Sequence, residues 1–356
     1  MKKIKKSLIL SQIIILFLFA ILQPKFVNGA TVSKAECVME AESGRILSAF
    51  NEHQKLPNAS TTKILTAITV IDNFDIDKEV VVPKGAVGIE GSSIYLREGE
   101  HLTVKELLYG LMLRSGNDCA VCLASTLCDY NEFISLMNKK AKEIGAINSN
   151  FVNPHGLHDE NHYTTAYDLC KISAYAIKNK TFKEIVSTKK VTISNEGYDY
   201  KRVLINKNKL LNTLEGCDGI KTGYTKKAGR CLVTSCNKNN MEIVSVVISS
   251  PEMWERSTEL INNAQNEYKM YNLIDKDEFN DKLYQRNDGK IALLSVNKSF
   301  SYPLKESELS NVKFKINGDS IENFINNDQE SGIFEIFVSN ELIFSQNIFK
   351  ILSNKN

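Results

Sequence analysis

The chain has 356 residues, of which 43% are hydrophobic and 24% charged. This composition can bury a core and excludes disordered and fibrous proteins, and the length favours one large domain followed by a smaller one. Residues 1–29 hold five lysines and no acidic residue, so the formal net charge of +2 becomes −3 without them. A slightly acidic chain argues against a basic nucleic-acid-binding surface, and we expect no nucleic-acid partner.

Residues 1–29 have the layout of a secretory signal peptide. Four lysines in the first six residues precede an apolar run over residues 8–22, which only Ser11 and Gln12 interrupt. Small residues at Val27-Asn28-Gly29 then predict cleavage after Gly29. An uncleaved membrane anchor is the alternative, although the run is short for a membrane span. Both interpretations predict an exported protein, working at the cell wall or outer membrane face or secreted.

Helical and strand patterns alternate along residues 35–266. Apolar stripes predict helices over residues 64–71 and 104–112, and apolar runs predict strands over 231–233 and 242–249. The pattern changes after residue 271, where strict alternation over 312–316 ends at a hairpin turn signal, Asn317-Gly318. Residues 334–338 and 342–344 predict a second hairpin. We therefore expect three parts: a signal peptide at 1–29, a main domain at 30–270 and a β-rich domain at 271–356.

The main candidate nucleophile is Ser60, in the tetrad Ser60-Thr61-Thr62-Lys63 at the start of the first apolar helix. Residues three apart on a helix share a face, so the Lys63 amine can reach the Ser60 hydroxyl and take its proton. Lys63 can act as a base only when neutral, a form favoured by burial, the helix dipole and a second cation. The Ser60 backbone N–H, at a helix N-terminus, is a candidate oxyanion donor.

The tetrad pattern S-x-x-K is weak alone, because it also begins at Ser187, Ser235, Ser295 and Ser310. Only Ser60 starts a strongly amphipathic helix in the main domain. Two further motifs follow it in the chain: Ser115-Gly116-Asn117 after a predicted helix, and the single Lys221-Thr222-Gly223 before a predicted strand. On an edge strand, the latter offers a cation and a hydroxyl to a carboxylate, and room for a substrate backbone to pair.

This order of motifs resembles the penicillin-binding serine D,D-peptidases, which share the three-motif set with class A β-lactamases. The resemblance covers most of residues 33–265 and is closest to the low-molecular-mass D-alanyl-D-alanine carboxypeptidases, peptidase family S11. The stretches that carry it are 56–63, 90–94, 115–118, 153–157 and 221–225. It implies an α+β fold class: a β-lactamase/D,D-peptidase-like domain with an antiparallel sheet flanked by helices, followed by a small all-β domain.

The resemblance also implies a mechanism and its residues. Ser60 is the nucleophile, Lys63 the general base, and Ser115 the proton relay to the departing amine. The backbone N–H groups of Ser60 and Tyr224 form the oxyanion hole, and Asn117 holds Lys63 and the substrate amide. Lys221 and Thr222 bind the terminal carboxylate, Gly223 belongs to the same motif, and Arg256 lies near the carboxylate pocket. The substrates are peptidoglycan stem pentapeptides, the inhibitors are β-lactams, and neither a cofactor nor a metal is expected.

Departures from the family pattern leave alternatives. The Ser115-Gly116-Asn117 spelling and the absence of a Glu-x-x-Leu-Asn segment favour a peptidase over a class A β-lactamase. A β-lactamase or D,D-endopeptidase on the same scaffold is one alternative, and a non-catalytic penicillin-sensing or wall-binding protein is another. Many relatives end in an amphipathic anchor helix, which residues 349–356 do not predict, so membrane contact stays open. His155, His158 and His162 lack the HExxH spacing of a zinc site.

Overall fold

The computed structural model describes residues 33–194 and 201–353. The predicted signal peptide and its cleavage site lie outside the described residues. No helix within the described part is long and apolar enough to cross a membrane.

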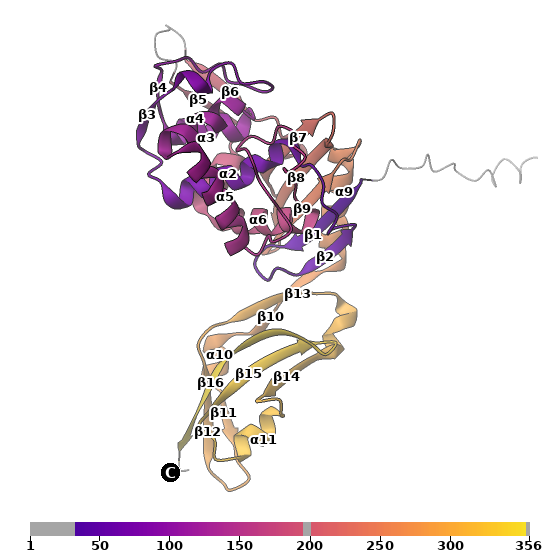
Figure 1. Cartoon of the computed structure of the whole chain (residues 1–356). Coiled ribbons are helices and arrows are strands. Elements are labelled where there is room, and N and C mark those ends of the chain that lie inside the picture. Colours follow the sequence, from indigo (N-terminus) through magenta and orange to yellow (C-terminus); the bar gives the residue numbers. More distant parts are fainter. Residues whose placement is uncertain (1–32, 195–200, 354–356) are drawn as a thin grey trace, which may run out of the picture. The chain divides into compact units, whose positions relative to one another are not determined.

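An antiparallel five-stranded sheet forms the centre of the main domain (Figure 1). Its strand order is β2-β1-β9-β8-β7, so the strand that carries Lys221-Thr222-Gly223 is an edge strand. Because β7 pairs only with β8 in this sheet, its other edge has unpaired backbone groups. The strands are β1 (Ala35–Glu40), β2 (Ile46–Phe50), β7 (Cys217–Thr225), β8 (Gly229–Lys238) and β9 (Met241–Ile248).

Helices cover both faces of this sheet because successive strand residues point to opposite sides. Cys37 and Val244 pack in one buried cluster with helices α2 to α7, whereas Val38 and Val247 pack in another with α8 and α9. The predicted helices and strands of this domain are confirmed in type. The helices are α2 (Lys63–Asn73), α3 (Val104–Leu113), α4 (Asn117–Leu127), α5 (Tyr130–Glu143), α6 (Ala166–Lys178), α7 (Lys180–Ser187), α8 (Leu210–Thr213) and α9 (Met253–Glu267).

Two small hairpin-like sheets and short 3-10 turns connect these helices. Strand β3 (Glu79–Val81) pairs with β4 (His101–Thr103), and β5 (Lys190–Ile193) pairs with β6 (Arg202–Ile205). The 3-10 turns are η1 (Ala59–Thr62) and η2 (Lys84–Ala86). Turn η1 matters most, because it leads directly into α2 and contains the first three residues of the Ser60 tetrad.

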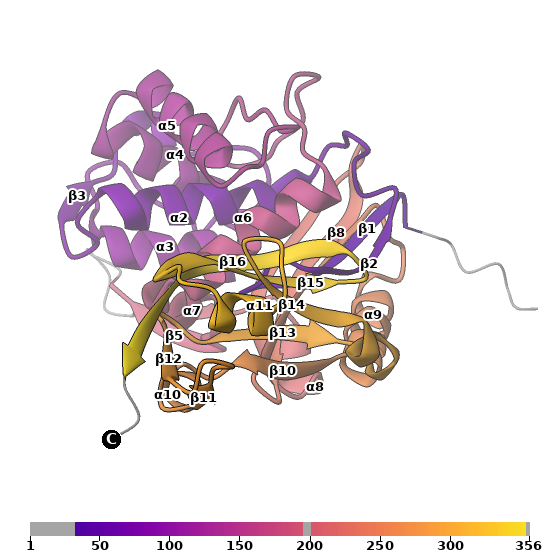
Figure 2. The same cartoon turned by 90° about the horizontal axis from the view of Figure 1, so that it is seen from below.

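The C-terminal domain is a separate β domain with its own buried cluster, as the sequence predicts. Its five-stranded sheet has the order β11-β12-β16-β15-β14, and in Figure 2 the long strand β16 runs beside β15. The strands are β11 (Leu283–Gln285), β12 (Ile291–Val296), β14 (Val312–Ile316), β15 (Ser331–Val338) and β16 (Glu341–Ser353), with a separate pair β10 (Lys269–Ile274) and β13 (Phe300–Leu304).

The Asn317-Gly318 turn differs from the prediction. The chain does turn there, with Asn317 and Gly318 both at positive φ, but it enters the short helix α11 (Ile321–Asn326) before β15 begins. Strands β14 and β15 are therefore paired across an inserted helix. A second short helix, α10 (Lys276–Asn280), and the 3-10 turn η3 (Glu306–Asn311) complete the domain.

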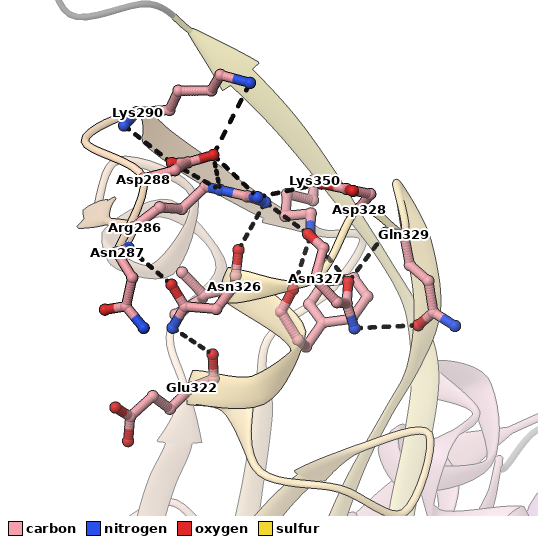
Figure 3. A network of polar contacts seen from close by, with 12 residues as sticks. Arg286, Asn287, Asp288, Lys290, Glu322, Asn326, Asn327, Asp328, Gln329 and Lys350 are labelled. Carbon is pink, nitrogen blue, oxygen red and sulfur yellow. Dashed lines mark hydrogen bonds and ion pairs between the residues drawn. The ribbon is translucent and has the colours of Figure 1, made fainter.

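Two buried cations hold the end of α11 (Figure 3). The Arg286 guanidinium donates to the carbonyl oxygens of Ile325 and Asn327, and the Lys350 ammonium donates to those of Phe324 and Asn327. These carbonyls at the helix C-terminus have no partner inside the helix and carry its negative dipole end. The contacts join β16 and the residue that follows β11 to the inserted helix and so fix it on the sheet.

Candidate active site

The nucleophile turn is tightly constrained. Turn η1 has three residues per turn, so Ser60 and Lys63 lie one above the other, and Lys63 Nζ is 2.9 Å from Ser60 Oγ. Ala59, immediately before Ser60, has a φ of +49°, a strained conformation for a residue with a side chain. The buried Asn58 amide donates to the hydroxyls of Thr61 and Thr62, both at 3.0 Å, which fixes this turn.

Of the five S-x-x-K serines, only Ser60 contacts the lysine of its own tetrad within the described residues. Ser187 donates instead to a carbonyl of its own helix, that of Lys183, and Ser235 donates to Glu242. The motif is therefore distinguished by local structure, a 3-10 turn entering a buried helix, rather than by its letters.

Lys63 is completely buried and has three polar contacts. Besides Ser60 Oγ, its Nζ lies 2.7 Å from Asn117 Oδ1 and 2.7 Å from the backbone oxygen of His155. Burial holds the Lys63 pKa well below its usual value, and the positive charges of Lys221 and Lys207 lower it further.

The three contacts define how a neutral Lys63 is oriented. A neutral amine has two N–H bonds and one lone pair, and the two carbonyl-type oxygens of Asn117 and His155 can only accept hydrogen bonds. Both N–H bonds are thus engaged by these oxygens. The lone pair is then directed at Ser60 Oγ, which is the arrangement that proton abstraction from a hydroxyl requires.

Asn117 is the first residue of α4, and its amide orientation is fixed. Its Nδ2 donates to the backbone oxygen of Glu90, so Oδ1 faces Lys63. An added Cβ at Gly91 would lie 2.8 Å from Asn117 Nδ2, so the loop packs directly against this amide. The structure brings Asn117 to Lys63. The Asn117 side chain is only 3% exposed and does not line the cavity described below.

Ser115 lies at the break between α3 and α4. It has a φ of +65°, which again places backbone strain at a site residue. Its side chain is nearly buried but reaches the cavity wall. The two strained residues, Ala59 and Ser115, are thus next to or within the first two predicted motifs.

The third motif lies on the free edge of β7. Lys221 is buried, its Nζ donates to the backbone oxygen of Thr222 at 3.0 Å, and burial together with Lys207 lowers its pKa to about 7. Gly223 lies against the nucleophile turn: an added Cβ would be 3.1 Å from both Asn58 O and Ser60 N. A glycine at this position therefore lets β7 approach the backbone of Ser60.

The three motifs meet around one cavity of about 510 Å³. Two of its cationic side chains, Lys207 and Arg230, were not predicted as site residues. Met253 and Trp254, at the start of α9, were also missed, as was the backbone oxygen of His155. The residues lining the cavity are Ser60, Ser92, Ser115, Lys207, Thr222, Gly223, Tyr224, Arg230, Met253 and Trp254.

Arg256 is not brought to this cavity. Its guanidinium forms two hydrogen bonds, of 2.8 and 2.7 Å, to the buried carboxylate of Glu36 on β1, and a third, of 2.8 Å, to Glu259. These contacts raise its pKa and hold the side chain on the sheet. Arg230, whose Nη1 donates to the backbone oxygen of Pro251, is the guanidinium at the cavity.

The histidines of the loop after α5 have structural contacts. An added Cβ at Gly156, which has a φ of +86°, would lie 1.9 Å from the oxygen of Ala59, so this loop is pressed against the nucleophile turn. His162 Nε2 lies 2.8 Å from Thr62 Oγ1. Burial lowers the pKa of His155 to about 3 and that of His162 to about 4. Among the described residues, no group of three or more His, Cys, Asp or Glu is placed to hold a metal ion.

Comparisons with known proteins match most of the chain. The family model described as D-alanyl-D-alanine carboxypeptidase matches residues 23–252. The D-alanyl-D-alanine carboxypeptidase DacF of Bacillus subtilis (strain 168) is 32% identical over 323 residues, which cover 87% of this chain and 83% of that protein. The DacA protein of Haemophilus influenzae (strain ATCC 51907 / DSM 11121 / KW20 / Rd) is 32% identical over 278 residues, covering 73% of this chain and 68% of that protein.

Solved structures of penicillin-binding peptidases match the fold of the chain. Penicillin binding protein 5 from Haemophilus influenzae matches with a TM-score of 0.73 and 26% identity, over 90% of this chain and 96% of that one. The Streptomyces K15 DD-transpeptidase matches with a TM-score of 0.60 and 30% identity, over 66% of this chain and 95% of that one. This protein therefore belongs to the D-alanyl-D-alanine carboxypeptidase family of peptidases.

Proposed function

We propose that the protein is a serine-type D,D-carboxypeptidase that removes the terminal D-Ala from peptidoglycan stem pentapeptides and is acylated by β-lactams. The observation that carries this proposal is the Lys63 amine. The amine is buried and lies 2.9 Å from Ser60 Oγ, and its N–H groups face two oxygens that can only accept hydrogen bonds. A base held neutral against a hydroxyl is what acyl transfer through a serine needs.

In the acylation step, Ser60 Oγ attacks the carbonyl carbon of the penultimate D-Ala while its proton passes to Lys63. The backbone N–H groups of Ser60 and Tyr224 stabilise the resulting oxyanion, a contribution of about 3 kcal/mol for one such donor. The C–N bond then breaks, Ser115 relays a proton to the departing amine, and D-Ala leaves. Water hydrolyses the Ser60 ester and regenerates the hydroxyl. A β-lactam follows the first half of this path and stops as the acyl-enzyme.

Substrate binding uses the same elements. Thr222 offers a hydroxyl to the terminal carboxylate, and Lys221 adds positive charge from beneath the cavity. Gly223 leaves room for an extended peptide along the free edge of β7. Asn117 acts chiefly by orienting Lys63. The resemblance assigned Arg256 to the carboxylate, but its pairing with Glu36 makes it a structural residue in this proposal.

The reaction takes place outside the cytoplasm in a three-part chain. Residues 1–29 act as a signal peptide, residues 30–270 form the peptidase domain and residues 271–356 the C-terminal domain. The enzyme works outside the cytoplasm on the peptidoglycan, without a cofactor. Peptidoglycan is assembled outside the membrane, so an exported peptidase and a peptide ending in D-Ala-D-Ala are consistent with each other.

The test is mass spectrometry of the intact protein after penicillin treatment, followed by peptide mapping, with D-Ala release from a stem pentapeptide measured in parallel. We expect one adduct, on Ser60, and stoichiometric loss of D-Ala from the peptide. Ser60→Ala should abolish both. Ser187→Ala, which changes the serine of another S-x-x-K tetrad, should retain both. An adduct on another serine, or rapid penicillin turnover without D-Ala release, would contradict the proposal.

A further inference from the structure

We propose that Cys217 and Cys236, on the neighbouring strands β7 and β8, form a cross-strand disulfide bond when the protein is exposed to a small-molecule disulfide such as oxidised glutathione. In the structure all eight cysteines, each within the described residues, carry free thiols. The bond is therefore a covalent modification of this form. Only export links the pair to the proposed function, because disulfides form and persist in extracellular and periplasmic compartments.

The two residues lie directly opposite each other in the antiparallel ladder of β7 and β8. The Asn237 N–H donates to the oxygen of Gly216 at 2.8 Å, so Cys217 and Cys236 are a non-hydrogen-bonded pair of this ladder. Opposed residues of this kind have Cα atoms about 4.5 Å apart. This separation is within the range of about 4.4 to 6.8 Å that a disulfide bond spans, so the backbone is already placed for the bond.

Both side chains are on the same face of the sheet. Cys236 belongs to the buried cluster under α8 and α9, and Cys217 packs against that cluster. An added Cβ at Gly216 would lie 3.3 Å from Cys236 Sγ, so this sulfur is next to the residue that precedes Cys217. The Cys236 thiol donates to the oxygen of Glu215, and the Cys217 thiol donates to that of Gly219. Formation of the bond requires the thiols to rotate away from these two oxygens.

Access distinguishes this pair from another pair of neighbouring cysteines. Cys170 on α6 donates to the backbone oxygen of Cys37 on β1, but both residues are completely buried. Cys217 is only partly buried, so a dissolved disulfide can reach its sulfur. Burial raises the pKa of Cys217 to about 11. The residue is therefore mostly a thiol at neutral pH, and the exchange is slow there because the thiolate is the attacking species.

The reaction consists of two successive thiol–disulfide exchanges. The Cys217 thiolate attacks one sulfur of oxidised glutathione, which forms a mixed disulfide and releases one glutathione thiolate that takes up the proton lost by Cys217. The Cys236 thiolate then attacks the Cys217 sulfur of the mixed disulfide, and the second glutathione leaves as a thiol. The two protein thiols are thus oxidised to a disulfide, while one glutathione disulfide is reduced to two thiols.

The crosslink fixes the start of the strand that carries the third motif. Strand β7 pairs only with β8 in its sheet, and this ladder is irregular between Cys217 and Gly219. A bond beside the irregularity keeps β7 from separating from β8 there. Neither cysteine lines the Ser60 cavity. We therefore expect the disulfide to stabilise the domain and to leave the acylation rate of Ser60 nearly unchanged.

The experiment compares purified protein incubated with oxidised glutathione and protein kept in dithiothreitol. Non-reducing peptide mapping by mass spectrometry should find one crosslink, between the peptides that contain Cys217 and Cys236, and the intact mass should fall by about 2 Da. The loop that the bond closes predicts a rise of about 6 to 12 °C in Tm, reversed by dithiothreitol. Acylation by a fluorescent penicillin should change less than about twofold, as for a distant site.

Three variants give the controls. Cys217→Ser should lack both the crosslink and the rise in Tm. Cys236→Ser should stop at the mixed disulfide, which is seen as a gain of one glutathione on Cys217. Cys128→Ser removes another partly buried thiol, at the end of α4, and should keep the crosslink and the rise in Tm. Penicillin labelling of Ser60 in each variant shows that it is folded.

A crosslink between other cysteines, or wild-type protein whose Cys217 and Cys236 stay unlinked after prolonged incubation, would overturn the proposal. A crosslink that leaves Tm unchanged would contradict its stabilising role. These results are independent of the proposed function, which is tested separately by D-Ala release from a pentapeptide.

Discussion

Replacement of Gly156 by alanine tests whether the loop that carries His155 and His162 holds the catalytic geometry. Gly156 contacts none of the reacting groups, yet its added Cβ would lie 1.9 Å from Ala59 O, 2.5 Å from Ala59 C and 2.8 Å from Thr62 Oγ1. Real Cβ atoms essentially never approach heavy atoms closer than 3.0 Å. The loop and the nucleophile turn must therefore separate by more than about 1 Å, and two of these three atoms belong to the backbone.

Either direction of movement disturbs Lys63. If the loop moves, the His155 oxygen leaves Lys63 Nζ, and if the turn moves, Ser60 leaves it. A misplacement of about 1 Å costs on the order of 100-fold in rate, so we expect penicillin acylation to slow by at least about that factor. The positive φ of +86° adds a strain of about 1 to 2 kcal/mol to the folded state.

Gly44→Ala is the control for the φ effect alone. Gly44 has a φ of +73°, but an added Cβ there would have no neighbour within 4 Å. This variant should lose about 1 to 2 kcal/mol of stability and keep its acylation rate. The assays are urea unfolding and stopped-flow acylation with a fluorescent penicillin. Normal acylation in folded Gly156→Ala would refute the idea that this loop positions Lys63.

Three further predictions concern the same site. Lys63→Met should slow acylation about 10²- to 10⁴-fold, as expected for loss of a general base. In the wild type the acylation rate should fall as pH falls, because Lys63 gains a proton. Stopped-flow kinetics measures both effects. His155 and His162 have folded pKa values of about 3 and 4, below the unfolded value of about 6.5. The unfolded state therefore binds more protons than the folded state as pH falls below 6.5, and each histidine should remove about 2 kcal/mol of stability by pH 5. Urea unfolding at a series of pH values should show this loss of unfolding free energy, and the loss should be smaller in His162→Gln. Gly223→Ala should slow acylation while changing the free energy of unfolding little, because its Cβ would lie 3.1 Å from Ser60 N. Unchanged acylation kinetics would contradict the close approach of β7 to the Ser60 backbone.

The sequence allowed the main elements and the three motifs to be predicted because their signals are local. The apolar stripe from Ile64 to Ile71 identifies a helix, and its position after Ser60 separates this tetrad from four others. Strict alternation identifies β14 in the same way. The turn at Asn317-Gly318 was predicted too, but the inserted α11 was not, since a six-residue helix has fewer than two turns and cannot show the 3.6-residue repeat.

The remaining site residues have no local signal. The third contact of Lys63 is a backbone oxygen, which any residue at position 155 would supply. Lys207 and Ser92 are separated by 115 positions in the chain and meet only because of the tertiary fold. Arg256 was misplaced for the related reason that its partner, Glu36, comes from a distant strand. Motif spacing reports neighbours along the chain, whereas these contacts depend on which strands lie side by side.

The grouping of lysines links the reaction to the substrate. A neutral general base needs a site without a nearby carboxylate, because an acidic partner would keep Lys63 charged. The carboxylate of Asp118, which raises the Lys63 pKa, accepts hydrogen bonds from backbone N–H groups of the loop that carries Ser92. Among the residues that the structure describes, Lys221 forms no ion pair with a carboxylate, and an incoming carboxylate can supply that negative charge. The arrangement that keeps Lys63 neutral is therefore the same arrangement that favours a peptide with a free C-terminal carboxylate.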